Sequence, residues 1–119
     1  MKTVSLIVWV DIPVLDLDRA IAFYKAVLAC EIDQQEQDGK QIGVFPKCAS
    51  LIVVPEIKSD SGILIYMSVE KGIRDAVKQV EEHGGKILQR IHTIEPYGFR
   101  AIVLDSEGNR IALHSSVDA

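Results

Sequence analysis

The 119-residue sequence has few cysteines and no long uninterrupted apolar run. Its two cysteines, Cys30 and Cys48, fit neither a disulfide framework nor a Cys-x-x-Cys metal pair, so we interpret them as free thiols in or near the core. No segment reaches the roughly 20 consecutive apolar residues of a membrane helix, which argues against a membrane partner. Asp11 and Pro13 interrupt the apolar N-terminal segment, which therefore indicates a buried strand rather than a secretion signal. We expect a cytoplasmic protein.

Clusters of basic residues are also absent. The 13 Lys and Arg residues are scattered, and the 17 Asp and Glu residues bring the net charge to −4. A surface that tracks nucleic-acid phosphates needs concentrated positive charge, so we expect no nucleic-acid partner. The sequence also lacks a Gly-rich phosphate loop, a Ser-His-Asp pattern and a nucleophile elbow. Its 48% hydrophobic content is typical of one soluble globular domain, residues 1–119.

Two segments have the periodicity of amphipathic helices. Residues 16–29 place their apolar side chains on one face, and Asp16 is suited to cap the N-terminus. Residues 71–87 contain a second apolar stripe, which ends where Gly84 and Gly85 supply a left-handed stop. The predicted stripes are Leu17, Ala20, Ile21, Tyr24, Val27 and Leu28 in the first helix and Ile73, Ala76, Val77 and Val80 in the second.

Short segments rich in Val and Ile favour β-strands. They lie at residues 5–14, 42–45, 50–55, 62–69, 86–91, 98–104 and 110–115. The order of strand, helix and several strands occurs twice, and the stripe that begins at Leu17 recurs from Ile73. We therefore predict an α+β fold of two βαβββ modules, about 1–58 and 59–119, whose sheets form an open barrel or trough with both helices outside. A ferredoxin-like α+β sandwich is the alternative, although it would need fewer strands.

Two motifs carry a resemblance to a known family. They are "VWVDIPVLDLDRAIAFY" (8–24) and "PYGFRAIVLDSEGNRIALHS" (96–115). Together with the paired modules, they resemble the vicinal oxygen chelate superfamily, which includes glyoxalase I, bleomycin-resistance proteins and extradiol dioxygenases. The resemblance covers essentially the whole chain. It implies the paired-module fold and a homodimer in which modules pair across or swap between chains, but it specifies the reaction poorly.

The resemblance also implies a metal site at repeated positions in the two modules. Where metal-dependent members have His or Gln in the first strand of each module, this chain has Trp9 and Leu64. Ala112 stands where the last-strand pattern Gly-Asn-x-Ile-Glu-Leu has its carboxylate. At the fourth position, we expect Leu51 and Val53 to point inward. None of these side chains can bind a metal, so we expect no metal and no cofactor.

Side-chain alternation predicts which residues line the concave face of the trough. Trp9 either stacks on a planar ligand or plugs a small barrel. Asp11 would be buried, and a buried carboxylate needs a partner. It would either form an ion pair with Arg100, Arg110 or His114, or else contact a ligand or transfer a proton. The candidate ligand-binding residues are Trp9, Asp11, Tyr66, Ser68, Tyr97, Arg100 and His114.

The histidines and one turn complete the set of candidates. His114 either acts as a general base or has a structural role. His83 is expected at the end of the second helix, where a cation complements the helix dipole. His92 is expected on a loop at the mouth of the trough. Tyr97 lies in a turn over residues 95–98, where it either caps the pocket or packs.

Together these features favour a metal-free protein that binds a small organic molecule. One alternative is a lyase or isomerase of the glyoxalase type, which either uses Asp11 and His114 as acid and base or has an atypical metal site. The other alternative is a non-catalytic interaction protein whose trough is filled by its own side chains. Whether the protein is an enzyme stays open at this point.

Overall fold

The computed structural model describes residues 7, 9–57 and 63–119, which form two βαβββ modules in succession. Module 1 contains β1 (Val10–Val14), α1 (Leu17–Leu28), β2 (Asp33–Gln37), β3 (Lys40–Val44) and β4 (Ala49–Val53). Module 2 contains β5 (Ile65–Ser68), α2 (Ile73–Glu82), β6 (Lys86–Thr93), β7 (Phe99–Leu104) and β8 (Arg110–Ser115). The expected boundary between the modules, at residues 58 and 59, falls on the undescribed segment 58–62.

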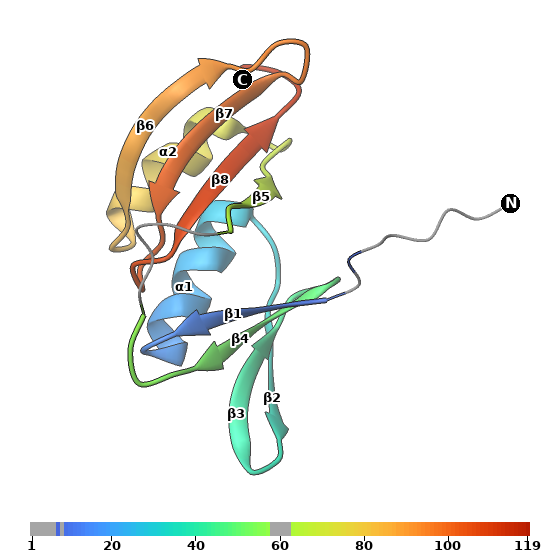
Figure 1. Cartoon of the computed structure of the whole chain (residues 1–119), viewed down its shortest axis with the longest axis vertical. Coiled ribbons are helices and arrows are strands. Elements are labelled where there is room, and N and C mark those ends of the chain that lie inside the picture. The colour runs from blue at the N-terminus through green and yellow to red at the C-terminus, as the bar shows by residue number, and fades with distance from the viewer. Residues whose placement is uncertain (1–6, 8, 58–62) are drawn as a thin grey trace, which may run out of the picture.

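Within these described ranges, each module forms one four-stranded sheet (Figure 1). The strand orders are β1-β4-β3-β2 and β5-β8-β7-β6. In each sheet the first strand pairs in parallel with the last, and the other pairs are antiparallel. The two sheets are separate and do not close into a barrel, so the predicted α+β fold is confirmed in an open form.

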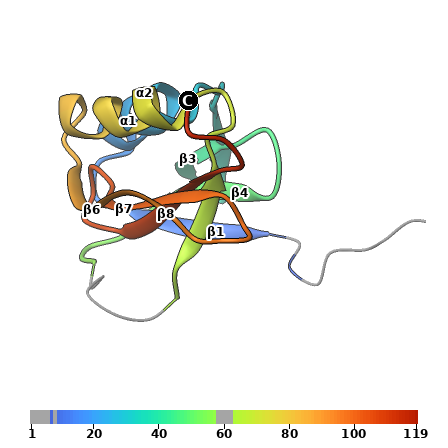
Figure 2. The ribbon, with the colours of Figure 1, turned by 90° about the horizontal axis from the view of Figure 1, so that it is seen from above.

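Both helices lie on one side of the two sheets. Figure 2 shows α1 and α2 side by side, with β1 and the strands of module 2 on the other side. Helix α1 contacts β3, β4 and α2, whereas α2 also contacts β6 and β8. Among the described residues, no helix combines the length and the hydropathy that a membrane crossing requires. Because both helices lie on the same side, no described helix covers the opposite face of either sheet.

The core lies between the helices and the sheets. In α1, Phe23 and Tyr24 are fully buried, and their rings meet edge to face with centroids 5.0 Å apart. Phe23 is absent from the predicted stripe, whereas Ile21 and Leu28, which belong to it, are only partly buried. Helix α2 buries Ile73, Ala76 and Val80 as predicted, and Val77 is partly buried.

Two strand features differ from the sequence-based expectation. Strand β2 was not predicted, because its five residues, DQQEQ, are all exposed and show no apolar alternation. Strand β6 extends to Thr93 and contains His92, which we expected on a loop. His92 lies opposite Arg100 in the β6–β7 register, so the pairing with β7 continues past the predicted strand end.

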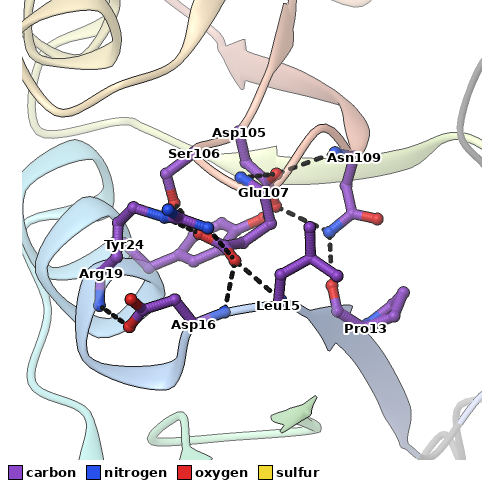
Figure 3. Close-up of polar contacts among 9 residues, drawn as sticks. All are labelled: Pro13, Leu15, Asp16, Arg19, Tyr24, Asp105, Ser106, Glu107 and Asn109. Atoms are coloured by element: carbon purple, nitrogen blue, oxygen red, sulfur yellow. Dashed lines mark hydrogen bonds and ion pairs between the residues drawn. The ribbon is translucent and has the colours of Figure 1, made fainter. Parts of the chain in front are cut away.

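The turn between β7 and β8 ties module 2 to the start of α1 (Figure 3). The carboxylate of Glu107 accepts the backbone N–H groups of Leu15 and Asp16, both at 2.7 Å, and pairs with Arg19 at 2.6 Å. Burial alone would raise the pKa of Glu107, but these hydrogen bonds outweigh it and hold the pKa at about 2. Asp16 caps α1 as predicted, by accepting the backbone N–H of Arg19 at 3.0 Å.

Asp105 organises the same turn from within. Its Oδ1 accepts the backbone N–H groups of Glu107 and Asn109, both at 2.8 Å, and its Oδ2 accepts the hydroxyl of Tyr24 at 2.5 Å. Asn109 reaches into module 1, where its Nδ2 donates to the carbonyl of Pro13 at 2.6 Å. The turn that begins β8 is thereby fixed against the end of β1.

The remaining expectations concern helix ends and thiols. His83 lies at the C-cap of α2 as predicted, with Nδ1 3.1 Å from the carbonyl oxygen of Gln79. Gly84 follows with a φ of 88°, the left-handed conformation expected there. Both cysteines are free; Cys30 is half-buried, but Cys48 is exposed, so the expected position near the core is wrong for Cys48.

Candidate ligand-binding site

The face opposite the helices carries two pockets, each lined by one module. The pocket on module 1 has a volume of about 480 Å³, and the one on module 2 about 400 Å³. The module 1 pocket is lined by Trp9, Asp11, Gln35, Glu36, Gln37, Ile42, Val44, Ser50 and Ile52. The module 2 pocket is lined by Tyr66, Ile94, Tyr97 and His114. We predicted one continuous trough, whereas the structure has two pockets, one on each sheet.

A buried hydroxyl joins the polar groups of the module 1 pocket. Ser50 is 3% exposed, accepts the indole N–H of Trp9 at 3.0 Å and donates to Oδ1 of Asp11 at 2.8 Å. The three side chains meet because Asp11 and Ser50 are opposite each other in the parallel pairing of β1 with β4. Trp9 is 49% exposed, so it does not plug a closed barrel.

The environment of Asp11 differs from the expectation. We predicted a buried carboxylate that either pairs with Arg100, Arg110 or His114 or else acts on a ligand, yet Asp11 is exposed and its hydrogen-bond donor is Ser50. No ion pair joins Asp11 to any of these three residues in the part of the chain that the structure describes. The reason is that the sheets are open, so the carboxylate keeps its hydration and needs no buried counter-charge.

On module 2, Arg100 is held in place by two side chains. Its Nη1 donates to the hydroxyl of Tyr66 at 2.7 Å, and its Nε donates to Nε2 of His92 at 3.1 Å. Because Nε2 of His92 accepts, the ring proton is on Nδ1, which donates to the carbonyl of Arg90 at 2.8 Å. Arg100 also lies 6.0 Å from the centroid of the Tyr66 ring. Predicted site residues Tyr66 and Arg100 are therefore neighbours.

His114 and Tyr97 meet at the module 2 pocket. Nε2 of His114 lies 2.5 Å from the carbonyl oxygen of Tyr97, so this nitrogen donates and is not available as a base. The side chain of Tyr97 is 72% exposed, which fits a residue at the pocket rim rather than a packing residue. Ser68 is exposed and lies opposite His114 in the register of β5 and β8, but it does not line the pocket.

The structure does not bring the candidate acid and base together. Asp11 lines the pocket on module 1, and His114 lines the pocket on module 2. Four other polar lining residues were missed by sequence reasoning: Ser50 was too weakly constrained to assign, and Gln35, Glu36 and Gln37 belong to the unpredicted strand β2. The position of Ser50 directly before buried Leu51 was the one available signal, since alternation places such a residue on the open face.

The structure is that of a small α+β protein built from two βαβββ modules, with the helices on one side of the sheets and the two pockets on the other. The chain belongs to the Glyoxalase/Bleomycin resistance protein/Dioxygenase superfamily, whose sequence profile matches residues 6–113. This confirms the resemblance drawn from the two motifs. Curated protein sequences contain no match to this chain.

Solved structures share the fold at low sequence identity. A hypothetical protein from S. aureus is 18% identical, with a TM-score of 0.73 and 95% of each chain covered. A glyoxalase/bleomycin resistance protein/dioxygenase family enzyme from Burkholderia phytofirmans is 15% identical, with a TM-score of 0.72 and coverage of 92% of this chain and 98% of the other. The fosfomycin resistance protein FosX from Listeria monocytogenes is 12% identical, with a TM-score of 0.68 and coverage of 95% and 92%. These likenesses show the fold.

The residues present do not fit the metal of the metal-dependent relatives. Ala112 is fully buried and lies opposite Tyr66 in the sheet. Leu51 and Val53 were expected to point inward, which is wrong: the register aligns them with the buried residues Ile12 and Val14. In module 1, Ser50 is the counterpart of Ala112. Ser50 lies opposite Asp11, and Ala112 lies opposite Tyr66 at the equivalent place in module 2. Within the described ranges, no three His, Cys, Asp or Glu residues are grouped to hold a metal ion.

Proposed function

We propose that this protein binds a small organic molecule on the open face of its sheets, with no metal at the ligand positions of its relatives. The arrangement of Trp9, Ser50 and Asp11 carries this proposal. It places a half-exposed aromatic ring and a carboxylate at the wall of a pocket of about 480 Å³, both oriented by one buried hydroxyl. Ligand pockets in proteins typically combine aromatic surface with a few oriented polar groups.

Module 2 supports the same function with different groups. Its pocket has the aromatic rings of Tyr66 and Tyr97 and the imidazole of His114 in its walls. Arg100 lies beside Tyr66 and is oriented by two hydrogen bonds. Open pockets on both modules argue against an interaction protein whose trough is filled. The separation of Asp11 and His114 between two pockets leaves acid–base catalysis by this pair without support.

Ligand binding is tested by a thermal-shift screen of planar organic compounds. A bound compound stabilises the folded state in proportion to the logarithm of its concentration over its Kd. We expect at least one compound to raise the Tm of the wild type and to lose this effect in Trp9→Ala. Val117→Ala is the matched control, because Val117 is an exposed apolar residue after β8 that lines neither of these pockets. The proposal fails if no compound in a chemically broad panel raises the Tm.

We also propose that the protein is a cytoplasmic homodimer with modules of about 1–58 and 59–119. The support is its superfamily membership, together with the open edges of β1 and β5 in the two sheets. Strand edges with unpaired backbone groups tend to pair with another chain. Size-exclusion chromatography with light scattering should give twice the chain mass of 13.2 kDa. A mass equal to one chain at high micromolar concentration would contradict the dimer.

A further inference from the structure

We propose that the pocket on module 1 binds an organic cation, whose charged group lies between the face of Trp9 and the carboxylate of Asp11. This inference rests on the proposed function, because it assigns a chemical class to the ligand of one of the two pockets. Three features of the pocket support it: its charge, its fixed geometry and its size.

The acidic and basic side chains near the two pockets are divided between the modules. Asp11 contributes a carboxylate to the module 1 pocket, whose lining includes no Lys, Arg or His. Glu36 also borders the pocket, but it lies opposite Gln41 in the β2–β3 register, so alternation directs its side chain to the other face of the sheet. The open face of module 2 instead carries Arg100, His92 and His114. A pocket with a carboxylate and no basic side chain in its wall attracts cations and repels anions.

The hydrogen bonds of Ser50 determine which groups face the ligand. The indole N–H of Trp9 is used by Ser50, so the ring offers its π-face rather than a donor. Ser50 occupies Oδ1 of Asp11, and Oδ2 has no hydrogen-bond partner among the described residues. A π-face attracts a cation through the ring quadrupole, and a carboxylate oxygen adds a direct charge interaction. A neutral ligand of the same shape would gain neither.

The dimensions of the pocket suit a planar organic group. Its volume of about 480 Å³ lies within the range of small-molecule sites. The apolar side chains of Ile42, Val44 and Ile52 form part of the wall, so the ligand has an apolar body to bury as well as a charge. An aromatic or amphiphilic ammonium, amidinium or pyridinium compound has both features.

Three planar compounds of nearly equal shape separate charge from shape. Benzamidine is a cation at neutral pH, benzamide is neutral and benzoate is an anion. Trp9 is the single tryptophan of the sequence, so its indole N–H gives one reporter signal in a ¹H–¹⁵N NMR titration. We expect benzamidine to shift this signal saturably at millimolar concentrations and benzamide to bind about fivefold more weakly. Benzoate should not shift the signal.

Variants test the role of the carboxylates. Asp11→Asn keeps the shape of the side chain and removes its charge, so it should weaken benzamidine binding by about three- to tenfold and leave benzamide binding unchanged. Glu36→Gln should have a much smaller effect, because the β2–β3 register directs the Glu36 side chain to the other face of the sheet. Asp75→Asn is the matched control, because it removes one exposed charge from α2 in module 2 and should leave benzamidine binding unchanged. An unchanged Tm would show that each variant is folded.

The outcomes distinguish this inference from the proposed function. Equal binding of benzamide and benzamidine, or unchanged benzamidine binding in Asp11→Asn, overturns the assignment of a cation. Shifts confined to the surroundings of Tyr66 and His114, with no saturable shift at Trp9, overturn the assignment to this pocket. In each of these cases the proposed function stands. It fails only if the broad panel of compounds also gives no stabilisation.

Discussion

Glu107 shows how a charged side chain is accommodated inside this fold. Its carboxylate receives hydrogen bonds from two backbone N–H groups, from Arg19 and from the hydroxyl of Ser106. A buried charge is tolerated where such donors replace its hydration. The backbone donors and Arg19 lie 88 to 92 residues earlier in the chain. No local sequence pattern reveals contacts of that span, so these partners of Glu107 were not predicted.

Glu107→Gln should lower the free energy of unfolding by about 2–3 kcal/mol at pH 7, because the change leaves buried donors unsatisfied. The folded-state pKa of about 2 lies below the ordinary value of 4.5. The stabilisation is therefore fully present above about pH 5 and is lost as the pH falls toward 2. Urea denaturation at a series of acidic pH values should show a shallower loss for the variant. Identical pH slopes for the two proteins would contradict this account.

Tyr24 gives the opposite pH dependence. Burial and the charge of Asp105 raise the pKa of its phenol well above 10, so the folded protein keeps the proton that the unfolded chain releases. Stability should consequently fall as the pH rises above about 10. Tyr24→Phe should cost about 1–2 kcal/mol at pH 7, through the lost hydrogen bond to Asp105, and should show a smaller alkaline loss. Denaturation curves at pH 8 to 11 test this; a variant that loses stability as steeply as the wild type would refute it.

At the level of elements, predictability depended on whether an element buries one face. Helices α1 and α2 carry apolar stripes that determine their packing, and both were predicted close to their observed bounds. Strand β2 has no buried residue and exists through its pairing with β3, which a local pattern cannot show. His92 was assigned to a loop because polar residues and a proline follow it, whereas pairing with β7 extends the strand.

Gly85 lies where α1, α2 and β7 approach one another closely. A Cβ at this position would lie 2.6 Å from the carbonyl oxygen of Leu104, 2.7 Å from Val80 and 2.8 Å from Phe23. Gly85→Ala should destabilise the protein by about 1–3 kcal/mol, since the backbone and both helices would have to move. At Gly39 a Cβ would meet nothing within 4 Å. Gly39→Ala should therefore lower the free energy of unfolding by only about 1 kcal/mol, the cost of a left-handed backbone with a φ of 78° for a residue that has a Cβ. Thermal denaturation compares the two, and an equal or smaller loss for Gly85→Ala would be evidence against close packing here.

At the scale of the molecule, the faces of β1, β5 and β8 were predicted correctly and that of β4 was not, and the exposure of the side chains was not predictable. Alternation is a local property, and it placed Asp11, Tyr66 and His114 on the open face correctly. Exposure depends on how far the two sheets curve toward each other, which is set by contacts between modules. For that reason Asp11 was expected to be buried and is instead exposed beside Ser50.

The same contacts between modules should make the chain unfold as one unit. Helices α1 and α2 contact each other, and Asn109 and Glu107 hydrogen-bond to the backbone of module 1. Trp9 fluorescence reports on module 1, whereas far-UV circular dichroism reports on both modules. We expect coincident urea midpoints from the two probes, the signature of a two-state transition. Asn109→Ala, which removes the contact with Pro13, should lower both midpoints together. If the Trp9 midpoint separated from the circular dichroism midpoint in the wild type, the modules would be independent and the turn at residues 105–109 would not couple them.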